Sequence, residues 1–240
     1  MYHSITFGDK NSWDDWFLIP SSRPAIAPPA VKTKTVDIPG AYGTVDFTEA
    51  LTGYPVYGNR TGSIQFLVDH EKWNAWHVTY ATVANYLHGR KMRMILEDDP
   101  AYYYEGRFTV QQWQSGQNFS AITINYDVYP FKREILSTLD DWLWDPFNFE
   151  FGVINDNLSS VSVGGSKTVT IYVSDITTER VAPTFIANAD GMSVTYNDTT
   201  VSLTKDKAVR PRGFVLVPGA NTLTFNGTGT VSIEYRGGLI

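Results

Sequence analysis

Short runs of alternating hydrophobic and polar residues occupy the chain from about residue 146 onward. Turn-forming pairs separate them, among them Gly164-Gly165, Asp190-Gly191 and Asn226-Gly227. Alternation with a period of two predicts strands buried on one face, and seven or more short strands separated by turns are typical of a β-sandwich. The runs are KTVTIYV, TFIANA, MSVTYN, TVSLT, GFVLV, NTLTF and TVSIEY. We therefore predict a second domain, a β-sandwich, over residues 146–240.

One segment of the preceding part has helical periodicity, with Asp69 as the expected N-cap and Gly89 as the stop. Its apolar stripe consists of Trp73, Trp76, Tyr80, Val83, Ala84 and Leu87. The segments around it have strand character: GSIQFLVD, KMRMILED, YYYEGRFTVQQW and FSAITINYDVYP. The last two predict a meander across Gln114–Asn118. We therefore predict a domain over residues 1–145, mainly β, with a helix at about 70–88 lying against a sheet.

Proline and turn residues interrupt this pattern between Pro20 and Arg60. The stretch PSSRPAIAPPAVKTKTVDIPGAYG carries five of the twelve prolines, and TVDFTEALTGYPVYGNRTG is rich in turn residues. Proline is a poor residue for a central strand, and long segments without compact structure are commonly functional or bound to a partner. We expect extended arms here that face solvent or a partner.

Composition narrows the classes of function. The 240 residues are 42% hydrophobic and 18% charged, with a net charge of −6 and no cysteine. Such a chain is expected to fold, and it has no basic field for nucleic acid and no thiolate for metal or catalysis. We find no signal-peptide pattern and no apolar run of membrane-span length, so a soluble protein made in a cytoplasm is expected.

Candidate catalytic and metal-binding residues are weak throughout the sequence. His77 and His88 are eleven positions apart, without a close second ligand, and no G-x-S-x-G elbow is present. Paired acids occur at Asp14-Asp15, Asp98-Asp99 and Asp140-Asp141. Neighbours on a strand point to opposite faces, and each pair lies at a segment edge where aspartate favours turns. We predict no catalytic residue, no cofactor and no metal.

Aromatic residues exceed what a core of this size requires, and several stand near acidic turns and the proline-rich segment. They are Trp13, Trp16, Tyr42, Tyr54, Tyr57, Tyr102, Tyr103, Tyr104, Trp142 and Trp144. Aromatic residues together with arginine are typical of protein–protein contacts. A structural or assembly protein is therefore the leading hypothesis, and a monomeric domain with an aromatic-rich core is the alternative.

Several ordered motifs resemble one known family. They are ITFGDKNSWDDWFLIPSSRP, VDIPGAYGTVDFTEALTGYPVYGNRTGSIQF, NYLHGRKMRMILEDDPAYYYEGRF and INYDVYPFKRE. Over residues 1–135 the chain is similar to the distal tail protein of long-tailed phages or prophages of Gram-positive bacteria. The remainder resembles the galectin-like sandwich of that family in pattern, closing with LTFNGTGTVSIEYRGGLI.

The resemblance implies a structural hub rather than an enzyme. Six copies would form a ring at the distal end of the virion tail, joining the tail tube to the baseplate and letting DNA pass without specific binding. The implied partners are the tail-tube protein, the tape-measure protein, the tail-associated fibre or lysin protein and a receptor-binding protein. The implied fold is a tail-tube-related β-barrel or sandwich with one helix, followed by the galectin-like sandwich. No membrane association and no cofactor are implied.

The segment of about residues 39–60 would be an arm reaching along a neighbouring subunit. The candidate subunit-interface residues are Tyr42, Tyr54, Tyr57, Arg60, Tyr103, Glu105 and Arg107. Three other functions stay open from the residues alone. They are a glycan-binding adhesion module for the host wall, a wall hydrolase that uses one of the acid pairs, and a tail-tube protein.

Overall fold

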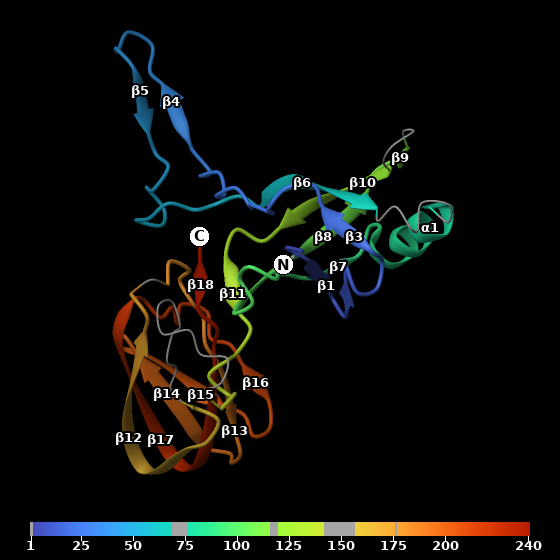
Figure 1. The fold of residues 1–240 in the computed structure, drawn as a ribbon. Coiled ribbons are helices and arrows are strands. Elements are labelled where there is room, and N and C mark those ends of the chain that lie inside the picture. Colours follow the sequence, from blue (N-terminus) through green and yellow to red (C-terminus); the bar gives the residue numbers. More distant parts are fainter. Residues whose placement is uncertain (1, 69–75, 116–119, 142–156, 176) are drawn as a thin grey trace. The chain divides into compact units, whose positions relative to one another are not determined.

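Three nine-residue strands form the centre of the N-terminal sheet in the computed structural model, which describes residues 2–68, 76–115, 120–141, 157–175 and 177–240 (Figure 1). They are β6 (Arg60–Val68), β8 (Tyr102–Val110) and β10 (Ser120–Val128). β10 lies between β8 and β6 and pairs antiparallel with both. The predicted pairing of β8 with β10 is thus present in the sheet, and β6 lies on the other side of β10.

Shorter strands extend this sheet in the order β2-β1-β7-β8-β10-β6-β3. Their bounds are β1 Ile5–Phe7, β2 Lys10–Asn11, β3 Leu18–Pro20, β7 Lys91–Leu96 and, paired with β10, β9 Gln114–Ser115. Every pairing on the path is antiparallel, so strands distant in sequence, such as β1 and β7, are neighbours.

One face of this sheet is buried in a core, and the other carries mostly polar residues. Phe66, Phe108 and Ile122 are inaccessible to solvent, and Phe7 meets Phe108 edge-on with ring centroids 5.2 Å apart. Helix α1 (Trp76–Leu87) covers this core with Val83 and Leu87. The period-two pattern of the strands and the helical spacing therefore meet in one core.

Helix α1 ends at a glycine. Gly89 has φ +76°, a left-handed backbone conformation that terminates helices at low cost when the residue has no Cβ. The amide of Gly89 donates to the carbonyl of Phe108 at 2.8 Å, which fastens this end of the helix to β8. The expected N-cap Asp69 and the stripe residue Trp73 lie outside the described residues.

The second compact unit comprises residues 133–239 and the first residues 1–132. The second unit has a sheet in the order β15-β14-β17-β13-β16, and β12 also pairs with β17. The bounds are β12 Val161–Val173, β13 Thr184–Ala187, β14 Met192–Tyr196, β15 Thr199–Leu203, β16 Ala208–Val209 and β17 Gly219–Glu234. Phe185, Phe214 and Phe225 meet in its core. A mainly β fold with a helix in its first part is confirmed.

Two predicted turns are wrong. The runs NTLTF and TVSIEY, apart from Tyr235, belong to the single strand β17, and Gly164-Gly165 lies inside β12. Gly165 stands directly opposite Gly227 in the ladder, with φ values of +87° and +117°. Because glycine adopts these conformations without strain, both strands continue through residues that ordinarily mark a turn. The run GFVLV is also no strand, although Phe214 and Leu216 are buried.

The segment after the first unit runs beside the last strands of the second. Glu134, in β11 (Lys132–Glu134), donates its amide to the Gly237 carbonyl at 3.1 Å, just before β18 (Gly238–Leu239). The Thr138 hydroxyl donates to the Ile233 carbonyl at 2.7 Å and accepts the Tyr235 amide at 3.0 Å. Because of these bonds, the chain from Arg133 onward belongs to the second compact unit. The predicted boundary at 145/146 lies outside the described residues.

Candidate assembly site

A hairpin arm lies between Val31 and Tyr57, which form a β-bridge at its root. Its strands β4 (Thr35–Asp37) and β5 (Thr44–Asp46) form a two-stranded sheet of their own (Figure 1). Apart from Thr48, every residue from 30 to 53 is exposed. A lone two-stranded hairpin is marginally stable in water, so the arm has little core of its own.

The two faces of the arm differ in chemistry. Val36 stands directly opposite Val45, and the amide of Phe47 donates to the carbonyl of Lys34 at 2.8 Å, which extends the same register. Opposed residues of an antiparallel pair share a face, and every second residue along a strand returns to it. We define the apolar arm face as Val36, Ile38, Val45 and Phe47, each 40–46% exposed. The opposite face carries Thr35, Asp37, Thr44 and Asp46.

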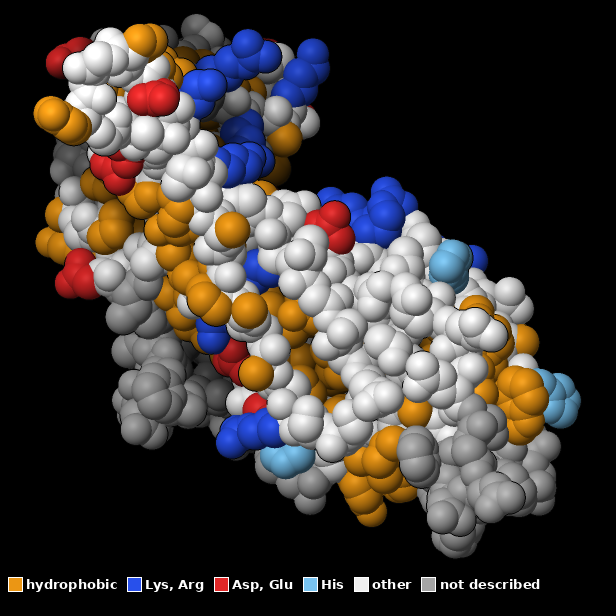
Figure 2. All heavy atoms as spheres, turned by 90° about the horizontal axis from the view of Figure 1, so that it is seen from above, with side chains coloured by type: hydrophobic (Ala, Val, Ile, Leu, Met, Phe, Trp, Pro, Cys, Tyr) orange, Lys and Arg blue, Asp and Glu red, His pale blue; other side chains and the backbone are white. Residues whose placement is uncertain are grey.

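Hydrophobic side chains reach the surface in several places in the space-filling view (Figure 2). Among the described residues, the large hydrophobic side chains that are exposed gather on the arm more than on any other segment. The arm contributes Val31, Val36, Ile38, Tyr42, Val45, Phe47 and Leu51. Single exposed hydrophobic residues are normal on a soluble protein, but a continuous exposed face indicates a surface that another molecule covers.

Backbone bonds close the root of the arm. The amide of Lys32 donates to the carbonyl of Val56 at 2.7 Å, and the amide of Gly58 donates to the carbonyl of Ala30 at 2.8 Å. The side-chain amide of Asn59 donates to the Asp127 carboxylate at 2.8 Å, which joins the root to the end of β10. The arm thus leaves the sheet from a defined base.

The predicted interface residues of the arm segment have different surroundings. Tyr42, at the tip, is 107% exposed, whereas Tyr54 and Tyr57 are half-buried. The Tyr57 ring meets Phe131 edge-on, with centroids 5.8 Å apart, so it packs on its own unit. Arg60 is 4% exposed. Within the single chain, Tyr42 is therefore fully available to a partner and Arg60 is covered.

The predicted interface residues of β8 also divide into covered and accessible side chains. Tyr103 is 4% exposed because the Arg93 guanidinium of β7 lies over its ring, 4.3 Å from the centroid. The carboxylate of Glu105 is 3.4 Å from the ammonium of Lys91, and the exposed Arg107 donates to the carbonyl of Gly89. Glu105 and Arg107 are thus accessible on the sheet surface, apart from the arm residues in sequence.

Each of the three consecutive acids that open EDDPAYYYEGRF has partners of its own. Glu97 accepts the amide of Ser4 at 2.6 Å, and the Asp99 carboxylate lies 2.6 Å from the Lys132 ammonium. Asp98 meets the His3 ring at 2.9 Å and the Arg23 guanidinium at 3.0 Å, contacts that lower the pKa of its carboxyl. Glu97 and Asp98 thus fasten the N-terminal segment to the end of β7, Asp99 bonds to Lys132, and the three acids form no catalytic dyad.

The other paired acids contain ionised, hydrogen-bonded carboxylates. The Lys10 ammonium lies 2.9 Å from Asp15, and that hydrogen bond lowers the pKa of Asp15. The backbone amide of Ser137 donates to Asp140 at 2.6 Å and lowers its pKa in the same way. A general acid needs the opposite shift, toward neutrality, so these carboxylates suit structural roles.

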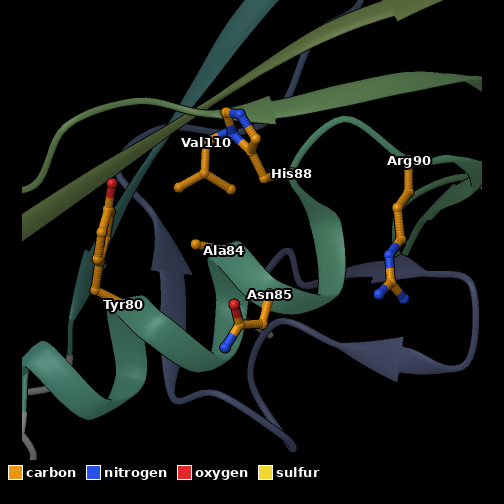
Figure 3. A pocket seen from close by; sticks show the side chains of 6 residues that line it. All are labelled: Tyr80, Ala84, Asn85, His88, Arg90 and Val110. Carbon is orange, nitrogen blue, oxygen red and sulfur yellow. The ribbon is translucent and has the colours of Figure 1, made fainter.

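Among the residues that the structure describes, no three metal-ligating side chains gather. An open hollow lies between helix α1 and the end of β8, lined by Tyr80, Ala84, Asn85, His88, Arg90 and Val110 (Figure 3). The Nδ1 atom of His88 accepts the amide of Val110 at 3.2 Å. This hollow has no carboxylate in its lining, and its histidine bonds to the backbone. In the part of the chain described, no helix has the length and apolarity of a membrane span.

No protein-family model matches the sequence, and no curated protein matches it. A solved structure shares its architecture: the SPP1 Dit (gp 19.1) protein, described as a paradigm of the hub adsorption apparatus in Gram-positive infecting phages. The match has a TM-score of 0.57 at 11% sequence identity and covers 99% of each chain. The chain has the Dit fold. Because the match spans both chains almost completely, the likeness to Dit extends over both units.

Sequence reasoning reached the Dit fold through ordered motifs but missed the apolar arm face. Its signal is present in TVDI and TVDF, where Val36, Ile38, Val45 and Phe47 alternate with polar residues. The prolines and glycines around them favoured an irregular segment over a hairpin with two distinct faces. The aromatic residues Tyr42, Tyr54 and Tyr57 drew attention to the right segment, although the continuous apolar surface belongs to their aliphatic neighbours and Phe47.

Proposed function

We propose that this protein is a structural hub of a phage tail tip and has no enzymatic role. Six copies close into a ring at the distal end of the tail, after synthesis in the host cytoplasm. The ring joins the tail tube to the baseplate and to the fibre or lysin and receptor-binding components, and DNA passes through it. The Dit fold supports a tail hub, and the exposed apolar arm face is the observation that carries the proposal.

The arm provides a surface of the kind that ring closure requires. A ring of identical subunits has heterologous interfaces, so each subunit presents two different complementary surfaces. The apolar arm face is one such surface, seated on a neighbouring copy. Each of its four side chains is a little more than half covered already, so its full burial contributes about 1 kcal/mol. Tyr42 and Leu51, both fully exposed, add to the contact.

Charge is compatible with a passage for DNA. The chain carries a net charge of −6, and its bases are dispersed among more numerous acids. Nonspecific binding to DNA depends on lysine and arginine that neutralise phosphates, so a chain of this composition has little affinity for a polyanion that must move. In the assembled tail, we assign the support of receptor-binding components to the second unit, a β-sheet unit of the Dit fold.

Charge substitutions on the apolar arm face test the proposal directly. Val36→Asp with Phe47→Asp places two carboxylates where the interface must be dry, so we expect rings to be lost while the fold persists. Light scattering measures the oligomer, negative-stain images show six-fold rings, and thermal unfolding checks the fold.

The matched control changes the other face of the same hairpin. Thr35→Lys with Thr44→Lys adds two charges to the polar face of the hairpin, each opposite an aspartate in the ladder, and leaves the apolar arm face unchanged. Rings should persist in this control. A tail-tip complex that assembles equally well with both pairs of substitutions would contradict a role for the arm in ring closure.

A further inference from the structure

Arg60 is a buried cation at the point where the arm returns to the sheet. It is the first residue of β6 and only 4% exposed, and burial lowers the pKa of its guanidinium. Among the described residues no carboxylate pairs with it, and its Nη2 atom has no hydrogen-bond partner. Burying an arginine without a counter-ion costs free energy of folding. The contacts of Arg60 therefore indicate a role other than stabilising the fold.

The contacts of Arg60 join three segments. Its Nε donates to the carbonyl of Pro130 at 2.6 Å, beyond the end of β10, and its Nη1 donates to the carbonyl of Ala27 at 3.3 Å, before the arm begins. The guanidinium also lies 5.5 Å from the centroid of the Tyr104 ring in β8. One side chain at the start of β6 thus connects the segment that enters the arm with the end of β10 and with β8.

The local sequence explains why an arginine is needed here. Pro28 and Pro29 follow Ala27 and have no amide hydrogen, so the segment that enters the arm donates few backbone hydrogen bonds of its own. Its carbonyls must be met by donors from elsewhere, and the amide of Gly58 and the guanidinium of Arg60 provide them. The planar fork of arginine reaches two carbonyls in fixed directions, which the single ammonium of a lysine does less well.

We propose that Arg60 is a positioning residue that sets the direction in which the arm leaves its unit. It acts on the interface through the backbone of the arm root, since its own side chain is covered. A subunit whose arm swings at the root presents the apolar arm face at many angles, and only one angle closes a ring. This consequence for rings rests on the proposed hub function, whereas the effect on the root does not.

The test compares Arg60→Met, which fills similar space without donors, with Arg60→Lys, which keeps the charge. Hydrogen exchange is measured at the amides of Lys32 and Gly58, which bond across the root, and at Ile124 in the β6–β10 ladder. We expect the root amides to exchange on the order of 10-fold faster in Arg60→Met, and less so in Arg60→Lys, with Ile124 unchanged. Arg212→Met, at an exposed arginine of the second unit, is the control and should change neither.

The possible results test the positioning role of Arg60 separately from the proposed hub function. Root amides that exchange at the wild-type rate in Arg60→Met overturn the proposal, and so does equal acceleration at Ile124, because Arg60 then stabilises the whole sheet. Faster root exchange with fewer closed rings in negative-stain images supports both the positioning role of Arg60 and the proposed hub function. Faster root exchange in a protein whose wild type never forms rings supports the positioning role of Arg60 and contradicts the proposed function.

Discussion

Gly106 of β8 lies directly opposite Val128 of β10 in the ladder. A Cβ atom added there would stand 2.1 Å from the carbonyl oxygen of Asp127 and 2.4 Å from the Cα atom of Val128. Both are backbone atoms, which cannot turn aside as a flexible side chain can. The glycine between Glu105 and Arg107 is thus required by the approach of two strands, although in the sequence it looks like a break in a strand pattern.

Replacing this glycine should destabilise the first unit strongly. Gly106→Ala forces β8 and β10 apart, and we expect a loss of about 3 kcal/mol in the free energy of unfolding, at the upper end for overpacking. Urea unfolding followed by tryptophan fluorescence measures it. The control is Gly58→Ala, where the nearest neighbour of the new Cβ is 3.7 Å away and the loss should stay below about 1 kcal/mol. Equal losses in the two variants would contradict this reading of Gly106.

At the scale of elements, strand β1 depends on ionised groups as well as on its ladder with β7. Contacts with His3 and Arg23 lower the pKa of Asp98, so the folded protein holds this carboxylate ionised more firmly than the unfolded chain does. A folded-state pKa below the unfolded value gives stabilisation that is present above the unfolded value of about 3.9. It is lost as the pH falls through the folded value.

Acid should therefore erase the effect of removing this carboxylate. We expect Asp98→Asn to lower the melting temperature at pH 6, and the difference from wild type to shrink toward zero between about pH 5 and pH 2. Melting curves across that range measure it, with Asp14→Asn as an exposed control from the same unit. A difference between Asp98→Asn and wild type that stays constant down to pH 2 would show that the carboxylate contributes nothing through its charge.

Elements whose pattern is local could be predicted from the sequence, and those decided by distant pairing could not. Alternation located β6, β7, β8 and β10 to within a few residues. Strand β17 was divided in two because only its register with β12 shows that Gly227 faces Gly165 within a continuous ladder. Tyr103 was a candidate interface residue from the sequence, but Arg93 from the neighbouring strand covers its ring.

The candidate site shows the same division between local and distant information. The arm could be located from its prolines and tyrosines, and its apolar face has a local signal in the alternation of TVDI and TVDF, although this signal was missed. The burial of Arg60 could not be predicted, because its partners Ala27 and Pro130 are 33 and 70 positions away in the sequence. A positive residue beside turn residues is ordinarily exposed, and only the path of the backbone brings those carbonyls to it.

At the scale of the whole molecule, the segment that joins the two units is fastened by residues close to the chain's last strand. The carbonyl of Gly238 accepts the amides of Thr178 and Glu179 at 2.9 and 3.0 Å, and Glu179 pairs with Arg133 at 2.6 and 3.1 Å. A Cβ atom on Gly238 would lie 2.3 Å from the Glu179 Oε2 and 2.7 Å from its Cβ. Glycine is therefore needed for Glu179 to hold Arg133.

Adding a methyl group at this position should release the joining segment. Gly238→Ala displaces Glu179 from Arg133, so we expect trypsin to cut after Lys132 and Arg133 on the order of 10-fold faster than in wild type. Mass spectrometry of the fragments over time measures the rate. Gly164→Ala, where the new Cβ atom meets nothing within 4 Å, should be cut like wild type. An unchanged rate in Gly238→Ala would contradict the fastening role.

The bond between the Glu134 amide and the Gly237 carbonyl also orders events during synthesis, because the two residues are 103 positions apart. A ribosome adds roughly 5–20 residues per second, so Glu134 waits roughly 5–20 seconds for its partner to be made. By then strands β1 to β10 and the whole arm have already left the ribosome. Nascent chains on one messenger can thus expose finished arms to one another while their second units are still incomplete.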